Sequence, residues 1–448
     1  MIKHILVSGF KTLSDFEMEL RSGLNILVGP NGSGKTNIIS FFEFLGLLQG
    51  MSVADAISSA GGAGSIFRKN GEDTYESNIH AKITGTTKLG YKKFLYYCYE
   101  FNIQIPDPGE SIIYSRQKIT LKRRTVDSID EKRIKEWDLD IELNFDKENG
   151  LKTHVNKCNN NDSKLMSRYS WRKLSYKTTK RRIGQALKHY ATPDQSIIDT
   201  LRFISREYWL PLFLELKGGY VYNIEPSKAK IPDDSAKKPG VSKDGTGLYS
   251  TLWALQQIEG IGERSVRSRL YSSFDFDLGD VNKNTMSDIK KYIRLANRWI
   301  SNIDVSNNPF DKQLQIRVSI SGAKEIPILP LSAMSDGTVK WIALITIILT
   351  TRTMFSLEEP ENYLHPHMLS EIMSIMRSHM GENGFILMST HSETLINNAT
   401  PNEIVVVSYQ NGKTIAKRVS NEKQLSREIR DTGFGLGYYY VSGSIEHG

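Results

Sequence analysis

Residues 29–36 read Gly-Pro-Asn-Gly-Ser-Gly-Lys-Thr and match the phosphate-binding pattern G-x-x-x-x-G-K-[ST]. Glycines let backbone N–H groups turn inward around phosphate oxygens. Lys35 would place its charge on the β and γ phosphates, and the Thr36 hydroxyl would bind Mg²⁺. An apolar run precedes the loop at 24–28, and a segment rich in Ile, Phe and Leu follows at 37–48. The pattern therefore predicts a strand, a nucleotide-binding loop and a buried helix whose positive end points at the phosphates.

A second candidate site is the stretch 354–361, Met-Phe-Ser-Leu-Glu-Glu-Pro-Glu, which predicts a short buried strand that ends in carboxylates. Burying carboxylates at the end of a strand costs free energy unless a cation lies near. Here the cation would be Mg²⁺ bound to a triphosphate. Glu358 would act on the metal, directly or through water, and Glu359 would orient or deprotonate the attacking water. The alternative is an exposed acidic turn that closes a core strand.

A third buried strand is predicted at 385–389, and it leads into His391. A lone histidine is more often structural. At the end of a core strand in a nucleotide-binding fold, it is also placed to sense the γ-phosphate.

The elements that must position these motifs alternate between strands and helices at both ends of the chain. Strands are predicted at 2–7 and 16–20, and the Tyr, Phe and Ile content of 75–123 favours an antiparallel meander. From about 125 the charge rises and helices are predicted, among them 196–209 and 286–303. Strand–helix alternation returns after 312.

This order predicts an α/β unit with a mixed sheet, split in two by a largely helical insertion. The expected parts are 1–124 with the phosphate loop, 125–311 as an assembly, partner-binding or nucleic-acid-binding insertion, and 312–448 with the acidic strand and His391.

The composition of the 448 residues, 39% hydrophobic and 24% charged, is typical of globular domains. No apolar run reaches the 18–20 residues of a membrane span, so no membrane association is expected. Two cysteines, Cys98 and Cys158, exclude a disulfide framework and a CxxC-based zinc site. The N-terminus has no apolar core of a signal peptide, so we expect a cytoplasmic protein.

The net charge of the chain is +8, and the surplus of basic residues comes from one segment. The segment 164–188 holds nine Lys or Arg and no acid, and the rest of the chain has 49 basic and 50 acidic residues. Interleaved aromatic residues suit nucleic-acid binding. Docking of an acidic protein partner and a merely solvated helix face remain as alternatives. The patch residues are Arg168, Arg172, Lys173, Lys177, Lys180, Arg181 and Arg182.

These motifs in this order resemble the ABC-type ATPase head of the RecF, SMC and OLD-like group, over about 1–110 and 312–448. In that resemblance 29–36 is the Walker A motif, 354–361 is the Walker B motif, and His391 is the switch histidine. The ABC-type (P-loop) fold, ATP and Mg²⁺ are what the resemblance implies.

The segment 331–338, Leu-Ser-Ala-Met-Ser-Asp-Gly-Thr, resembles the signature motif of this group. The resemblance implies that Ser335 and Gly337 contact the γ-phosphate of ATP held by a second subunit, so at least a homodimer is expected. The segment 9–12, Gly-Phe-Lys-Thr, resembles the Asn-Phe-Arg-Ser segment beside the adenine and phosphates.

The chain has no sustained heptads and no CxxC hook, unlike long SMC-type proteins, and the 57 residues after His391 are too few for a Toprim domain. It therefore resembles a stand-alone OLD-like ATPase, like those of the anti-phage modules Septu and PARIS. There the ATPase binds and controls a separate effector, often a nuclease. The alternative is a RecF-like DNA-binding ATPase of DNA repair.

The candidate residues fall into three groups. They are Glu359 and His391 for catalysis; Lys11, Asn31, Gly32, Ser33, Gly34, Lys35, Thr36, Asn37, Ser335 and Gly337 for ATP; and Thr36 and Glu358 for the metal.

Overall fold

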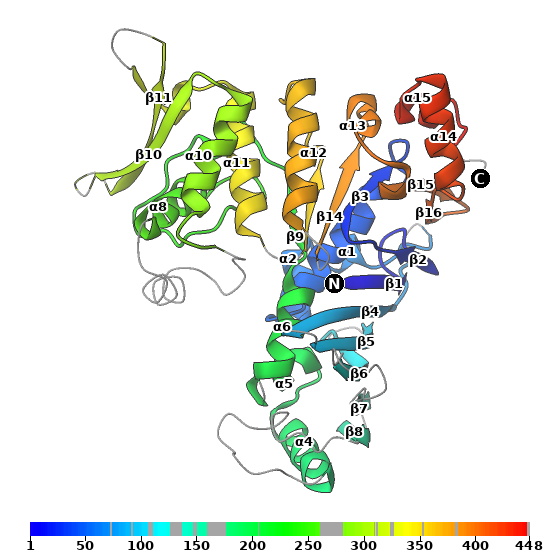
Figure 1. The fold of residues 1–448 in the computed structure, drawn as a ribbon. Helices are drawn as coiled ribbons and strands as arrows, with labels where there is room; N and C mark the ends of the chain where they lie inside the picture. The colour runs from blue at the N-terminus through cyan, green and yellow to red at the C-terminus, as the bar shows by residue number, and fades with distance from the viewer. Residues whose placement is uncertain are drawn as a thin grey trace. The chain divides into compact units, whose positions relative to one another are not determined.

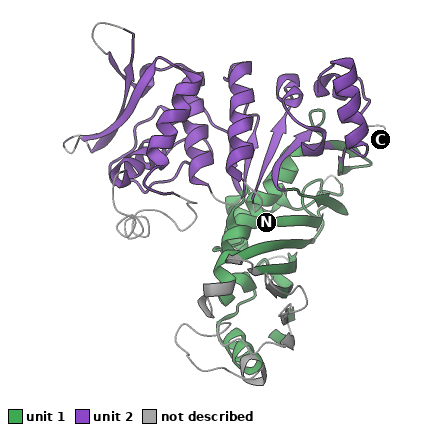
Figure 2. Ribbon diagram, viewed as in Figure 1, with its two compact units in different colours: residues 1–21, 29–219, 407–417 green, residues 22–28, 220–406, 418–448 purple. Residues whose placement is uncertain are grey.

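Two structural units, each assembled from three stretches of sequence, make up the computed structural model of the chain (Figures 1 and 2). Unit 1 comprises Met1–Arg21, Gly29–Gly219 and Val407–Lys417, and unit 2 comprises Ser22–Val28, Tyr220–Val406 and Arg418–Gly448. The structure describes residues 1–71, 74–90, 93–105, 111–125, 137–146, 150–158, 176–204, 206–259, 281–308, 310, 312–322, 327–351, 354–380 and 384–445.

Unit 1 is organised by a seven-stranded antiparallel sheet in the order β2-β1-β4-β5-β6-β7-β8. Its strands are β1 (Ile2–Ser8), β2 (Phe16–Glu19), β4 (Asn78–Gly90), β5 (Lys93–Gln104), β6 (Ile113–Thr125), β7 (Trp137–Asp146) and β8 (Gly150–Cys158). Its helices are α1 (Lys35–Leu47), α2 (Val53–Ser59), α3 (Ala63–Ile66), α4 (Tyr176–Tyr190), α5 (Ile197–Ile204) and α6 (Arg206–Lys217). The meander predicted at 75–123 is confirmed by β4, β5 and β6.

The sheet of unit 1 buries one face. A row across four neighbouring strands, Ile83, Tyr99, Ile119 and Ile141, is in register and fully buried. Side chains alternate between the two faces of a strand, so such a row defines the core side of the sheet. Helix α6 contacts β4, and α2 contacts β6.

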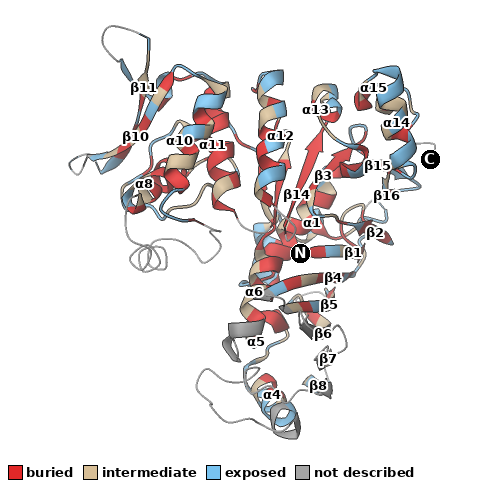
Figure 3. Ribbon diagram, viewed as in Figure 1, coloured by how far each residue is buried: buried red, intermediate tan, exposed pale blue. Residues whose placement is uncertain are grey.

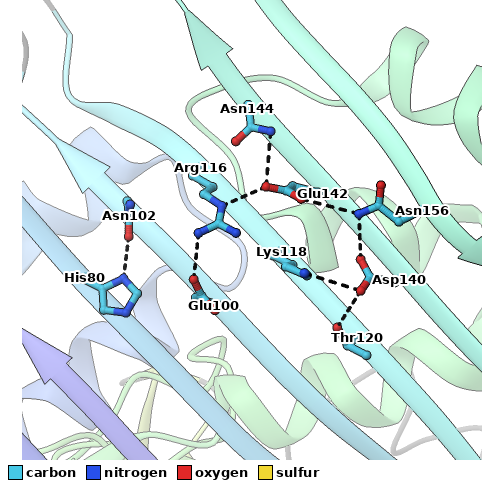
Figure 4. Close-up of polar contacts among 10 residues, drawn as sticks. All are labelled: His80, Glu100, Asn102, Arg116, Lys118, Thr120, Asp140, Glu142, Asn144 and Asn156. Atoms are coloured by element: carbon cyan, nitrogen blue, oxygen red, sulfur yellow. Dashed lines mark hydrogen bonds and ion pairs between the residues drawn. The ribbon is translucent and has the colours of Figure 1, made fainter.

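The opposite face of this sheet is polar, and its charges pair with each other (Figure 4). Arg116 donates from Nη1 to Glu100 at 3.0 Å and from Nε to Glu142 at 2.9 Å. Lys118 lies 3.6 Å from Asp140. Cross-strand pairs of opposite charge stabilise a sheet modestly. The charged side chains of β5, β6 and β7 therefore pair with one another.

Unit 2 contains a parallel sheet in which β15, β3, β14, β13 and β9 are successive neighbours. The strands are β3 (Gly23–Val28), β9 (Tyr220–Tyr222), β13 (Met354–Glu358), β14 (Phe385–Thr390) and β15 (Ile404–Gln410). Only Ile404–Val406 of β15 belong to unit 2, and these residues pair with β3. The register sets Val28 beside Thr390, and Ser389 beside Glu358. The carboxyl ends of β3, β14 and β13 therefore lie side by side at the same end of the sheet.

A second, antiparallel sheet and several helices complete unit 2. The sheet is formed by β10 (Ile300–Asn308), β11 (Gln313–Ile320) and β12 (Ile328–Pro330). The helices are α7 (Pro226–Ala229), α8 (Leu248–Ile258), α10 (Thr285–Ala296), α11 (Asp336–Thr350), α12 (Pro366–Met380), α13 (Glu393–Asn397), α14 (Glu422–Thr432) and α15 (Leu436–Val441). Helix α11 is buried over most of its length (Figure 3), and Trp341 donates from Nε1 to the Tyr292 carbonyl at 3.0 Å.

The predicted α/β class is confirmed, but two predicted helices are wrong in extent. The helix expected at 286–303 ends at Ala296, and β10 follows it. There Ile303 and Val305 are buried against β11, so tertiary pairing overrides the helical spacing. The helix expected at 196–209 is instead α5, ending at Ile204, and α6, which continues to Lys217.

The segment expected as an insertion, 125–311, is shared between the units. It supplies β7, β8 and α4–α6 to unit 1, and β9, α7, α8, α10 and β10 to unit 2. Strands β7 and β8 were not predicted, although Leu139, Ile141 and Leu143 alternate on β7 and are buried. The residues that the structure describes include no helix long and apolar enough to cross a membrane.

Candidate nucleotide-binding site

The phosphate loop lies in unit 1, directly before α1. Lys35 is buried and donates from Nζ to the Gly29 carbonyl at 2.8 Å and to the Pro30 carbonyl at 3.0 Å. The loop thus wraps around its own ammonium group. Ser33 is buried, and its Oγ has no hydrogen-bond partner among the described residues. Buried hydroxyl groups are normally paired, so this orphaned oxygen fits a loop built to receive polar ligand atoms.

Two glycines of the loop stand where no side chain fits. A Cβ on Gly29 would lie 2.1 Å from the Val407 carbonyl oxygen. A Cβ on Gly34 would lie 2.0 Å from Thr414 Oγ1, and Gly34 has φ 104° as the N-cap of α1. A positive φ is costly for any residue but glycine. Gly29 and Gly34 are therefore required by the backbone of the loop, while Asn31, Gly32 and Thr36 are exposed.

A hydrogen-bonded chain ties the 9–12 segment to the loop. Asn37 Nδ2 donates to Thr12 Oγ1 at 2.7 Å, and Thr12 Oγ1 lies 2.6 Å from Thr414 Oγ1. Thr414 belongs to β16 (Lys413–Arg418), 402 residues beyond Thr12. No local sequence signal marks Thr414, and sequence reasoning missed it.

The position of Lys11, next to Thr12 in the sequence, is fixed by the packing of Phe10. The Phe10 ring packs 5.5 Å from the ring centroids of both Phe41 and Phe44 on α1. Lys11 itself has φ 48° and donates its N–H to the Ile66 carbonyl at 2.7 Å. Unit 1 therefore brings together the 9–12 segment, Gly34 and Asn37.

The acidic strand and its turn lie in unit 2. Glu358 is the last residue of β13 and is half-buried, whereas Glu359 is exposed. The N–H of Glu359 donates to the Ser389 carbonyl at 3.0 Å, and Asn362 Nδ2 donates to Glu359 Oε2 at 3.1 Å. Glu359 has φ 43°, an uncommon value that the surrounding contacts must hold. Its carboxylate is thus presented from a constrained turn.

Glu361 lies in the same turn, and no role was predicted for it from the sequence. Its Oε1 accepts from Thr390 Oγ1 at 2.6 Å and from the His391 N–H at 3.1 Å. The His391 side chain is exposed. The carboxylate therefore holds the backbone at the end of β14 and joins the turn after β13 to His391.

The signature-like segment caps α11 in the same unit. Ser335 is the N-cap, and its Oγ accepts from the Thr338 N–H at 3.4 Å. A Cβ on Gly337 would lie 2.7 Å from the Tyr363 carbonyl oxygen, so the start of α11 and the turn at 363 are in close contact. Helix N-termini favour anions. Ser335 is exposed and so open to a ligand.

The basic patch is described only in part. Arg168, Arg172 and Lys173 lie outside the described residues, as does the side chain of Lys177 on α4. Lys180, Arg181 and Arg182 are exposed on α4, whose buried side is formed by Ile183 and Leu187. The described members therefore form a solvent-facing basic stripe.

Among the described ranges, no cluster of three His, Cys, Asp or Glu side chains is arranged to hold a metal by itself. Thr36 belongs to unit 1 and Glu358 to unit 2, and their role as Mg²⁺ ligands stays a prediction. Asp140, on the polar face of the sheet in unit 1, accepts from Thr120 Oγ1 and Asn156 Nδ2.

Two family models match separate parts of the chain. Residues 1–208 match the family described as "AAA ATPase domain". Residues 254–397 match the family described as "AAA domain, putative AbiEii toxin, Type IV TA system". Two parts of the chain are therefore similar to ATPase domain families, which supports ATP binding and ATPase activity in general.

A curated relative and several solved structures are also similar. The DNA replication and repair protein RecF of Aliivibrio fischeri is 28% identical over 83 residues, 18% of this chain and 20% of the relative, so the match spans a fifth of that protein. An SMC head bound to the C-winged helix domain of ScpA has a TM-score of 0.46 at 14% identity, and covers 94% of this chain and 99% of its own. The SMC head domain from Thermotoga maritima has a TM-score of 0.38 at 10% identity with the same coverage.

Proposed function

We propose that this chain is an ABC-type ATPase of the RecF, SMC and OLD-like group that pairs with a second copy through ATP and controls a separate effector protein. The observation that carries the ATPase is the loop 29–36. It surrounds the buried ammonium of Lys35, leaves the Ser33 hydroxyl unpaired, and has no room for side chains at Gly29 and Gly34. An anion with several oxygens would accept hydrogen bonds from both the Lys35 ammonium and the Ser33 hydroxyl.

The proposed chemistry assigns one task to each residue. Lys35 leaves the loop carbonyls for the β and γ phosphates, and backbone N–H groups of the loop bind the remaining oxygens. Mg²⁺, held by Thr36 and Glu358, would neutralise developing charge on the phosphates. Glu359 accepts a proton from, or orients, the attacking water, and His391 senses the γ-phosphate. Phosphoryl transfer depends mainly on positioning, and the double tether of the Glu359 turn supports that role.

The proposed pairing of two copies rests on the signature-like segment. Ser335 and Gly337 lie at the exposed start of α11, an anion-binding geometry. The resemblance assigns them to the γ-phosphate of a second subunit's ATP. The same resemblance supports a separate effector, such as a nuclease in an anti-phage module.

The ATPase is tested with Glu359→Gln and a matched control, Glu371→Gln on α12. We expect phosphate release to fall about 100-fold or more in Glu359→Gln, a loss of roughly 3 kcal/mol of transition-state stabilisation. ATP should stay bound, and the particle mass measured with ATP and Mg²⁺ should double. Equal hydrolysis by Glu359→Gln and wild type would remove Glu359 from the mechanism.

The effector is tested by expressing the tagged chain with its neighbouring genes in the presence of ATP and weighing the purified particle. A stoichiometric nuclease or other effector in one complex supports the control function. An ATPase that purifies as a bare dimer with bound DNA contradicts it.

The second candidate is a RecF-like DNA-binding ATPase, favoured by the RecF match and by the exposed basic stripe on α4. It predicts DNA-stimulated hydrolysis. Changing Lys180, Arg181 and Arg182 to glutamine should then lower the salt slope of DNA binding by about 3, because each lost phosphate contact removes roughly 0.9. An unchanged slope would argue for a protein partner or simple solvation of this stripe.

A further inference from the structure

Lys340 is a buried cation on α11. It lies five residues beyond Ser335, and only 1% of it is exposed. Its neighbours along the helix, Val339 and Trp341, are buried apolar residues. An ammonium group in such a place is strongly unfavourable unless specific partners compensate for the lost water. The partners of Lys340 therefore indicate why the charge is there.

All of those partners belong to the turn after β13. Lys340 Nζ donates to the Glu359 carbonyl oxygen at 3.3 Å and lies 5.7 Å from the centroid of the Tyr363 ring. Burial lowers the pKa of Lys340 to about 8, while the carboxylates of Glu361 and Glu359 act in the opposite direction. The lysine therefore remains mostly protonated at neutral pH and can donate to the turn.

The hydrogen bond from Lys340 acts on the main chain of Glu359 itself. The N–H of Glu359 donates to Ser389, and its carbonyl accepts from Lys340. Both peptide groups that flank the Glu359 Cα are thereby tethered, which sets the direction of its side chain. The φ of 43° at Glu359 and of 69° at Tyr363 shows that this turn is held in uncommon backbone conformations.

We propose that Lys340 is a positioning residue that holds the main chain of Glu359 and links the start of α11 to the carboxylate that acts on water. The inference rests on the proposed role of Glu359. Because Gly337 also contacts the Tyr363 carbonyl, α11 meets the turn at two points along its first two turns. A shift of the signature-like segment is thus transmitted to Glu359.

The test is Lys340→Met, which keeps the length and apolar stem and removes the donor, with Lys290→Met as a matched control. Lys290 lies on α10 in the same unit and donates to Glu259 at 3.1 Å, away from the turn. We expect kcat for ATP hydrolysis to fall about 10- to 100-fold in Lys340→Met, because misplacing a catalytic group by about 1 Å has an effect of this size. KM and the equilibrium binding of ATP should change less than about twofold. Lys340→Arg keeps a cationic donor and should recover part of kcat.

Thermal unfolding separates positioning from simple support of the fold. Removing a buried charge should leave the melting temperature of Lys340→Met equal to or above that of wild type. The inference is overturned if kcat stays within twofold of wild type, or if kcat falls only together with ATP binding and folded fraction. Glu359→Gln in the same assay shows which proposal failed. If it hydrolyses ATP normally, the assignment of Glu359 falls, and the role of Lys340 falls with it.

Discussion

Lys230 and Asp336 form an ion pair in which Lys230 Nζ lies 2.7 Å from Asp336 Oδ1. Asp336 opens α11 within the signature-like segment, and Lys230 follows α7 on a separate stretch of unit 2. A carboxylate beside Ser335 would repel the γ-phosphate that this segment is proposed to meet. The pair therefore offsets an unfavourable charge at an anion-binding helix end.

We predict that Lys230→Ala weakens ATP-dependent association about fivefold, or roughly 1 kcal/mol for an exposed charge. The reason is the uncompensated Asp336 carboxylate. The double variant Lys230→Ala with Asp336→Asn should regain the wild-type association constant, because it removes both charges. Sedimentation in the Glu359→Gln background, with ATP and Mg²⁺, measures all three. A double variant no better than Lys230→Ala would show that the lysine acts by another route.

A side chain at Gly34 should abolish nucleotide binding. In Gly34→Ala the new Cβ meets Thr414 Oγ1, and the residue must also keep φ 104°. Gly150→Ala is the matched control, because Gly150 has φ 68° in the same unit but no atom within 4 Å of a built Cβ. The control should bind ATP normally and lose only about 1 kcal/mol of stability. Titration with a fluorescent ATP analogue measures both, and normal binding by Gly34→Ala would contradict the loop geometry.

Gly34 also shows how far the sequence predicts the site. The loop 29–36 can be recognised in the sequence because its motif is contiguous, and Gly29 and Gly34 leave no room for a side chain. Thr414 is not predictable, since it reaches Gly34 only through the fold. Lys340 was missed for a related reason: in a run of apolar residues it resembles a chance charge, and only the turn at Glu359 gives it partners.

The strands β7 and β8 were missed although a signal existed. Leu139, Ile141 and Leu143 alternate with acids, as a half-buried strand should. The high charge of the region favoured helices instead. On the sheet Glu142 pairs with Arg116 and Asp140 with Lys118, so charge there reflects cross-strand pairing and not a solvated helix.

The pH dependence of stability tests the environment of Lys340 independently of catalysis. Burial lowers its folded-state pKa to about 8 from an ordinary value of 10.5. Between these two pH values the unfolded chain binds more protons than the folded chain, so folding becomes more favourable as pH rises. The cost of the buried charge is fully present below pH 8, on the order of 3 kcal/mol, and has gone above pH 10.5.

We therefore predict that Lys340→Met is more stable than wild type at pH 7 and that this advantage shrinks as pH rises from about 8 to 10.5. Other titrating groups are common to both proteins, so the difference between their urea unfolding midpoints isolates Lys340 to first order. Hydrogen exchange of the α11 amides localises the effect to unit 2. If the difference between the two midpoints is constant with pH, or grows as pH rises, the pKa of Lys340 is not lowered by burial in the folded protein.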